Sequence, residues 1–169
     1  MKVESFRDLF ETELRYAYDC EQKLVKKGLP TMIDAANSPE LRQGLEQHLQ
    51  ETRNHVARLE RVFSICGLQA KTDDNDVFDE ISSAVKDSIS EVEDGSLRDA
   101  ALIINGNVVE HYEMAIYGSL ISFARQLGLE DAVQLLQQTL QEEKAADAKL
   151  TQLGESTINA SAAQERRAA

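Results

Sequence analysis

Apolar residues recur every three or four positions along most of this chain, the spacing that places them on one face of an α-helix. Four long segments show the pattern, and a shorter one lies between the second and the third. They cover about residues 5–36, 39–66, 76–92, 96–127 and 129–153. Only 8 Gly and 2 Pro interrupt the 169 residues, which favours long helices over many strands and turns. The sequence therefore predicts an all-α protein.

Glycine and proline mark where these helices bend, begin and end. Gly28 and Pro30 predict a kink near the end of the first helix, because proline cannot continue a regular helical hydrogen-bond pattern. Ser38 and Pro39 suit the cap and first position of the second helix. Glycines are expected to end the three other long patterns, namely Gly67, Gly128 and Gly154. We expect residues 1–154 to form one domain and the small, polar residues 155–169 to form a disordered tail.

The long connection between the second and third long helices indicates the topology. Residues 67–95 contain a polar loop, the short helix and a Gly-Ser break. A short loop would make the helices that it joins antiparallel neighbours, whereas a long crossover allows them to run parallel. We therefore predict a four-helix bundle made of two helical hairpins, with a short fifth helix in the crossover.

The third long helix is apolar on more than one face, for example at Leu102 and Val109 on one side and at Ile104 and Val108 on another. Such a helix is buried on several sides or also serves a subunit interface. An interface with another subunit is therefore one explanation of this pattern.

Four glutamates form two pairs with the same spacing of 30 residues, and each member of the second pair lies 92 positions after its counterpart. They are Glu21, Glu51, Glu113 and Glu143. In each hairpin a further polar residue, His55 or Asp147, follows the second glutamate by four positions, which keeps it on the same helical face. Glu110 lies three residues before Glu113 and can reach the same level.

These acidic positions coincide with apolar stripes. Glu21 lies four residues after Ala17 and three before Leu24, and Glu143 and Asp147 continue the stripe of the last helix. Counted from the turn of its hairpin, each glutamate lies within about one helical turn, ~5.4 Å, of its partner. Ionised carboxylates gathered in a low-dielectric interior repel each other and lose hydration, unless they share protons or bind cations. A divalent metal is the simplest compensation.

The overall charge and hydropathy exclude other classes of function. The formal net charge is −12, which repels phosphate backbones, and no basic patch with interleaved aromatic residues appears, so we expect no nucleic-acid partner. No apolar run approaches the ~20 residues of a membrane span. The amino-terminal segment is charged and periodic and does not resemble a signal peptide. We expect a cytoplasmic protein without a membrane partner.

The pattern resembles the ferritin-like superfamily, in which two helices each give a Glu and the other two each give Glu-x-x-His. The motif Glu110-His-Tyr-Glu113 is similar to the paired glutamates in the third helix of rubrerythrin. Four stretches within residues 9–153 resemble the YciE/YciF family of bacterial ferritin-like stress-response proteins. They are LFETELRYAYDCEQKL, SPELRQGLEQHLQETRNHVARLERVF, VEHYEMAIYGSL and LLQQTLQEEKAADAKL. The resemblance implies a helical dimer with a metal site and no firmly assigned reaction.

The expected ligand set departs from the di-iron pattern, because three residues separate Glu51 from His55 and Asp147 stands where a second histidine would be. Iron is the first expectation, and an oxygen-rich site also leaves Mn, Mg and Ca open. In the hypothesis of a dinuclear site, Glu51 and Glu143 bridge two ions. The terminal ligands are then Glu21, His55, Glu110, Glu113 and Asp147.

Two other histidines rank below His55. His48, one turn before Glu51, is a ligand, a neighbour of the ligands or an interhelical donor, and His111 is a packing or interface residue.

Three functions are compatible with this sequence. The first is a ferritin-like metalloprotein, with oxygen- or peroxide-linked redox chemistry. The second is a non-catalytic structural dimer that keeps the fold without a functional metal centre. The third is a storage cage, although nothing in the sequence specifies a large assembly.

Overall fold

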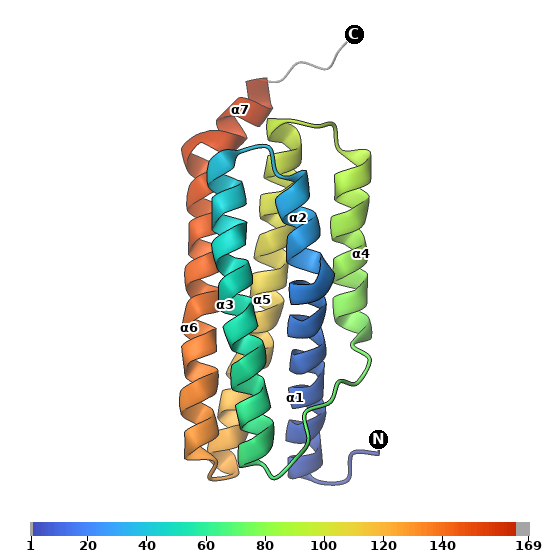
Figure 1. The fold of residues 1–169 in the computed structure, drawn as a ribbon, viewed down its shortest axis with the longest axis vertical. Coiled ribbons are helices and arrows are strands. Elements are labelled where there is room, and N and C mark those ends of the chain that lie inside the picture. The colour runs from blue at the N-terminus through green and yellow to red at the C-terminus, as the bar shows by residue number, and fades with distance from the viewer. Residues whose placement is uncertain (1, 165–169) are drawn as a thin grey trace.

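The computed structural model describes residues 2–164, which are mostly helical and contain no strand (Figure 1). The helices are α1 (Phe6–Lys23), η1 (Leu24–Gly28), α2 (Leu29–Ala35), α3 (Pro39–Ile65), α4 (Asp76–Glu91), α5 (Ser96–Gln126), α6 (Glu130–Leu153), η2 (Gly154–Ile158) and α7 (Asn159–Gln164). The all-α prediction is confirmed, and the five predicted helices match to within one residue at their ends, apart from the continuation after α6. Within residues 2–164, no helix has both the length and the apolar character needed to cross a bilayer.

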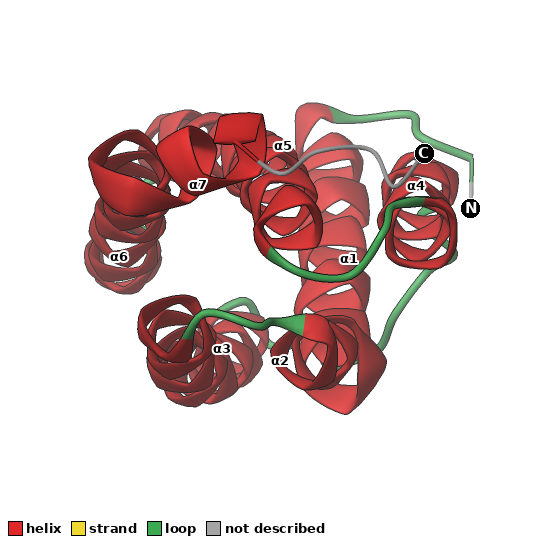
Figure 2. Cartoon of the chain, turned by 90° about the horizontal axis from the view of Figure 1, so that it is seen from above, coloured by secondary structure: helices red, strands yellow, loops and turns green. Residues whose placement is uncertain are grey.

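Four long helical rods form a ferritin-like bundle. The first rod consists of α1, η1 and α2, and the others are α3, α5 and α6. Figure 1 shows α3 and α5 running in the same direction, because the chain returns through α4 between them. Seen from above, α4 stands outside the four rods, beside α1 and α5 (Figure 2). The long crossover therefore makes α3 and α5 run parallel, as predicted.

The first rod changes its helical pitch where a kink was predicted. Residues Leu24–Gly28 form a π-helical turn, in which the Leu29 N–H donates to the Leu24 carbonyl five residues earlier. Pro30 follows directly and has no N–H to offer, and such a proline is a common site of helix irregularity. A π-turn inserts one extra residue into the helix and so rotates the following side chains. Both Leu29 and Met32 are buried after it.

A buried carboxylate ties the turn between α2 and α3 to the start of α5. Asp99 is 3% exposed, and its two oxygens each accept a backbone N–H, from Asn37 and from Ser38, both at 2.7 Å. The Ser38 hydroxyl in turn accepts from the Leu41 N–H and caps α3. This carboxylate therefore joins the two hairpins at one end of the bundle.

The end of the chain differs from the prediction. Gly154 keeps right-handed helical angles, and the chain continues through η2 and α7, so the expected disordered tail is wrong for residues 155–164. Ile158 is 4% exposed and packs in the core, which gives this polar segment an apolar anchor. Residues 165–169 lie outside the described part of the chain.

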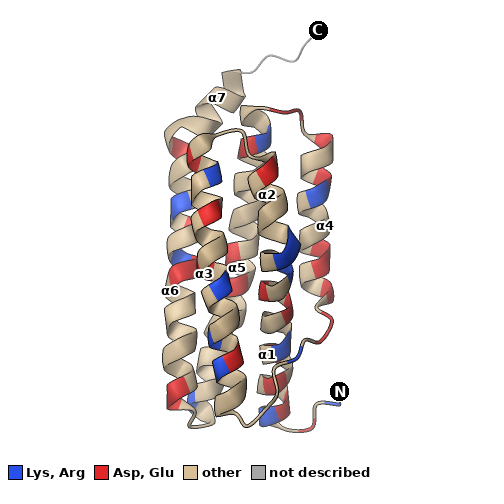
Figure 3. Cartoon of the chain, in the orientation of Figure 1, with Lys and Arg blue, Asp and Glu red and all other residues tan. Residues whose placement is uncertain are grey.

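The core has an apolar cluster towards each end of the bundle. One contains Phe10, Leu59 and Leu120, and the other contains Leu41 and Leu102. Because these residues occupy opposite ends of the same rods, a middle layer is left between the clusters. Acidic segments of α5 and α6 lie at this middle level in Figure 3.

Candidate metal centre

The middle layer of the bundle consists of four carboxylates and two imidazoles, each no more than 6% exposed. All four rods contribute to it. The side chains are Glu21 from α1, His48 and His55 from α3, Glu110 and Glu113 from α5, and Glu143 from α6.

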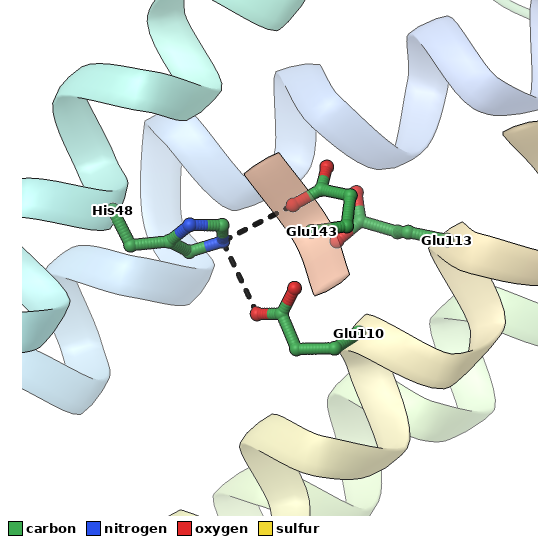
Figure 4. A group of neighbouring side chains, drawn as sticks. All are labelled: His48, Glu110, Glu113 and Glu143. Atoms are coloured by element: carbon green, nitrogen blue, oxygen red, sulfur yellow. Dashed lines mark ion pairs between the residues drawn. The ribbon is translucent and has the colours of Figure 1, made fainter. Parts of the chain in front are cut away.

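These side chains form two adjoining groups with metal-ligating geometry. The first contains His48, Glu110, Glu113 and Glu143, and within it one ligand atom of each residue lies within 4.8 Å of the others (Figure 4). His48 Nε2 is 3.2 Å from Glu110 Oε1 and 3.9 Å from Glu143 Oε2.

The second group contains Glu21, His55 and Glu143, with the same limit on separation. His55 Nδ1 lies 3.0 Å from Glu143 Oε1 and 3.4 Å from Glu21 Oε1. Glu143 belongs to both groups and offers a different oxygen to each histidine. It is therefore the residue through which two bound ions would be linked.

The layer fits cations because several of its buried carboxylate oxygens have no hydrogen-bond donor. Among the described residues, Glu21 Oε2, Glu110 Oε2, Glu113 Oε2 and both oxygens of Glu143 are buried without a hydrogen bond. Buried polar atoms are normally paired, and an ionised carboxylate has only acceptors to offer. Oxygen and imidazole nitrogen are the ligand types of divalent iron and manganese sites.

Burial and mutual repulsion change the protonation of these carboxylates. Burial, reinforced by the charges of Glu143 and Glu21, raises the pKa of Glu113 well above its ordinary value. Burial also raises the pKa of Glu143 to about 7, although its contact with His55 acts in the opposite direction. Without a cation, the layer therefore retains protons on its acids.

The two histidines respond in the complementary way. Burial opposes their charged form, but Glu21 and Glu143 outweigh it and raise the pKa of His55 to about 11. Glu110 likewise raises the pKa of His48 well above 6.5 despite burial. A metal needs neutral imidazole and ionised carboxylate, so a bound cation would displace these protons.

Neighbouring residues orient His55. Its Nε2 lies 2.8 Å from Glu142 Oε2, and Arg58 holds the same carboxylate with two hydrogen bonds of 2.6 and 2.8 Å. When His55 is neutral, a proton on Nε2 that faces Glu142 leaves the Nδ1 lone pair directed at Glu21 and Glu143, as in metal sites where a carboxylate fixes the histidine tautomer.

Two further side chains contact the acids from inside the core. The Tyr117 hydroxyl donates a short hydrogen bond to Glu21 Oε1. The Cys20 thiol lies 3.6 Å from Glu113 Oε1, and burial together with Glu113 and Glu21 raises the thiol pKa well above 9.0. Cys20 thus stays protonated.

The structure brings five of the seven residues expected as ligands into the layer, and these are Glu21, His55, Glu110, Glu113 and Glu143. It places Glu51 at the edge, where its side chain is 30% exposed. One Glu51 oxygen accepts from Gln47, and the other lies 3.6 Å from His48 Nδ1.

Asp147 lies outside the layer. It accepts a hydrogen bond of 2.6 Å from Asn107 and lies 3.2 Å from Nε2 of His111, a side chain that is 68% exposed. The seventh expected ligand therefore contacts the flank of α5.

His48 ranks below His55 in the sequence-based prediction, but in the structure each of the two histidines belongs to one ligand group. The buried stripe of α3 contains Leu41, Leu45, His48, Thr52, His55 and Leu59. Its alternating steps of four and three are a regular helical repeat, and this repeat would have identified both histidines. The contact of Glu142 with His55 was not predicted from the sequence.

The fold and this layer define a ferritin-like helical bundle with a buried carboxylate–histidine centre. The sequence matches the family DUF892, a domain of unknown function, over residues 5–163. It is 35% identical to Protein YciF of Escherichia coli (strain K12) over 160 residues, which cover 94% of this chain and 96% of that protein. The chain therefore belongs to the YciE/YciF family.

Two solved structures agree with this assignment. The E. coli stress protein YciF superposes with a TM-score of 0.88 at 34% identity, covering 93% of this chain and 99% of that one. YcfI of Rhodopseudomonas palustris, which is named as a candidate structural protein, superposes with a TM-score of 0.86 at 38% identity, covering 89% and 95%. The bundle seen here is thus shared with these relatives.

Proposed function

We propose that this protein is a cytoplasmic, ferritin-like metal-binding protein of the bacterial stress response, with two divalent cations in the middle of the bundle. The observation that carries the proposal is the set of buried carboxylate oxygens without hydrogen-bond partners. The link to stress rests on the similarity to the E. coli protein, which is named a stress protein.

The two groups of side chains divide the ligands. His48, Glu110 and Glu113 would hold one ion, Glu21 and His55 the other, and Glu143 both. Each group contains one imidazole, whereas Mg and Ca prefer sites made of oxygen ligands alone. The imidazoles therefore favour iron, and next manganese, as the bound metal.

Bound iron would supply one-electron chemistry towards oxygen or peroxide. The chain itself contributes His55, held in place by Glu142, and Tyr117, whose hydroxyl supports Glu21. Apolar clusters lie on either side of the layer.

Metal content provides the test. The chelator-treated protein is mixed anaerobically with Fe²⁺ or Mn²⁺, separated from free metal and analysed for bound ions, beside Glu143→Gln and Glu130→Gln. We expect up to two ions per chain in the wild type and in Glu130→Gln, which alters an exposed acid of the same helix. Glu143→Gln should lower the affinity at least ~10-fold. Wild type that binds no more metal than Glu143→Gln would overturn the proposal.

The second candidate is a structural homodimer, and one surface favours it. Leu97, Ile104 and Val108 lie along the outer face of α5 and are 44%, 64% and 48% exposed. Apolar side chains in a row on a surface are typical of an interface. If dimerisation through α5 is correct, Ile104→Asp should convert a dimer into a monomer in light scattering, whereas Glu130→Gln should not. Dimerisation without metal binding would leave this candidate as the function.

A further inference from the structure

A cavity of about 90 Å³ leads from the surface to the metal centre. It lies between α3, α5 and α6 and is closed on the remaining side by the first rod, near the π-turn. Its walls are mainly apolar and include Met32, Leu45 and Leu150, whereas its inner end presents the buried side chains of His48 and Glu110. Such a combination, an apolar recess with a few convergent polar groups, is typical of small-molecule sites.

The polar end has unused hydrogen-bonding capacity. Glu110 is 2% exposed and its Oε2 has no hydrogen-bond partner, and the same is true of Nδ1 in His48, which is 6% exposed. A ligand that reaches this end can therefore satisfy buried groups that the protein leaves unpaired.

The dimensions of the cavity limit what can enter. At Gly106, a side-chain Cβ would lie 2.7 Å from Leu150 Cδ1, so that only glycine leaves the present room for Leu150. An apolar cavity of ~150 Å³ accommodates a benzene ring, and this one is smaller. The occupant must be a chain of a few carbon atoms.

The entrance is spanned by a chain of hydrogen bonds between α6 and α3. Lys149 Nζ donates to Gln47 Oε1 at 2.9 Å, and Gln47 Nε2 donates to Glu51 Oε1 at 2.9 Å. Lys149 and Gln47 are exposed, and exposed side chains change rotamer within nanoseconds. Rotation of these two side chains would open the entrance without any movement of the helices.

We propose that this cavity binds a small amphipathic molecule, with a neutral O–H head, as in an alcohol or alkyl hydroperoxide, against Glu110 and a short alkyl tail beside Met32 and Leu150. An O–H group can donate to the unpaired Glu110 oxygen, whereas a carboxylate head has only acceptors to offer and cannot. The inference deepens the proposed function by naming the substrate class of the same centre. Binding itself needs only the cavity, so it can be tested without metal.

The test uses 1-butanol and the full-length chain after chelation, with the methionine methyl groups labelled for NMR. Met32 lines the cavity, and Met114 of α5 does not, so each spectrum contains its own reference. We expect the Met32 signal to shift and saturate in the millimolar range, as is usual for so small a ligand, while Met114 stays in place. Butyrate, which has the same tail and a head that only accepts hydrogen bonds, should bind at least ~10-fold more weakly because it leaves the Glu110 oxygen unpaired.

Two matched variants locate the site. Ala146 lines the cavity at its rim, and Ala148 lies two residues further along α6 on the exposed side. We expect Ala146→Leu to abolish the Met32 shift and Ala148→Leu to preserve it. The inference is overturned if Met32 does not respond, if both methionines drift without saturation, or if Ala146→Leu binds butanol like the wild type. If the chain binds butanol but takes up no metal in the metal-content test described above, only the proposed function is refuted.

Discussion

Replacing Glu143 by glutamine should stabilise the metal-free protein and weaken its response to metal. Glu143 is buried, belongs to both ligand groups and has two oxygens without hydrogen-bond partners. Glutamine has nearly the same shape as protonated glutamate but cannot ionise. The variant therefore removes the burial of a charge and leaves the packing of α6 intact.

The magnitude follows from the pKa of Glu143, which burial raises from 4.5 to about 7. That change corresponds to about 3 kcal/mol of free energy against the ionised form in the folded state. For a chain of 169 residues, the melting temperature of the metal-free variant at pH 8 should exceed that of the wild type by roughly 6–12 °C.

The sign of the effect depends on pH in a defined way. Below about pH 4.5 Glu143 is protonated in both the folded and the unfolded chain, so the variant has no advantage there. Between 4.5 and about 7 only the unfolded chain loses the proton, and the stability of the wild type falls. Above about pH 7 Glu143 is ionised in the folded chain as well, and the full cost of burying its charge is present. The difference between variant and wild type should grow across this window and then level off.

Bound metal should reduce the difference in melting temperature between Glu143→Gln and the wild type. A ligand at 100 times its dissociation constant stabilises the protein by about 2.7 kcal/mol, which raises the melting temperature of the wild type by roughly 5–11 °C. If glutamine weakens binding ~100-fold, the variant gains only about 0.4 kcal/mol at the same concentration.

Thermal unfolding followed by circular dichroism, at pH 4, 6 and 8, with and without Mn²⁺, measures both effects. Glu130→Gln serves as the exposed control on the same helix. Two results would contradict this prediction. One is a lower melting temperature of metal-free Glu143→Gln than of the wild type at pH 8, and the other is a difference in melting temperature that is the same at all three pH values.

Three other substitutions have separate expected outcomes. Glu142→Gln should weaken the hold on His55 and lower metal affinity ~10-fold, as judged by titration. Glu51→Gln and Asp147→Asn should retain close to the wild-type metal content in elemental analysis, since both residues are partly exposed and lie outside the two ligand groups; a loss of metal would show that they move inward. Asp99→Ala leaves two backbone N–H groups without their acceptor and should cost about 2–5 kcal/mol in chemical denaturation, whereas unchanged stability would show that water replaces the carboxylate.

The helices could be predicted because local signals and tertiary packing agree. Ser38 and Pro39 begin α3 as expected, and Gly67 and Gly128 follow their helices with positive φ. Gly154 misled the prediction because a glycine can also remain helical. Here Ile158 packs in the core, and that contact depends on a partner distant in sequence.

The centre was only partly predictable because helical height and helical rotation are separate quantities. Distances from the hairpin turns place Glu51 at the right level, but its direction around α3 differs from that of His48 and His55, and it lies at the edge. Asp147 continues an apolar stripe, yet Asn107 and His111 hold it on the flank of α5. Contacts such as that of Glu142 with His55 join residues 87 positions apart, and no local pattern in the sequence indicates them.

The division of ligands between the two hairpins has a consequence for biosynthesis. Glu21, His48 and His55 leave the ribosome first, and neither ligand group is complete until Glu143 follows. The 88 residues from His55 to Glu143 (143 − 55) take roughly 4–18 s to translate at ~5–20 residues per second. A nascent chain in that interval has no complete site in which to capture iron. Metal loading is therefore expected to follow translation, so the cell can make the protein first and load it when metal becomes available.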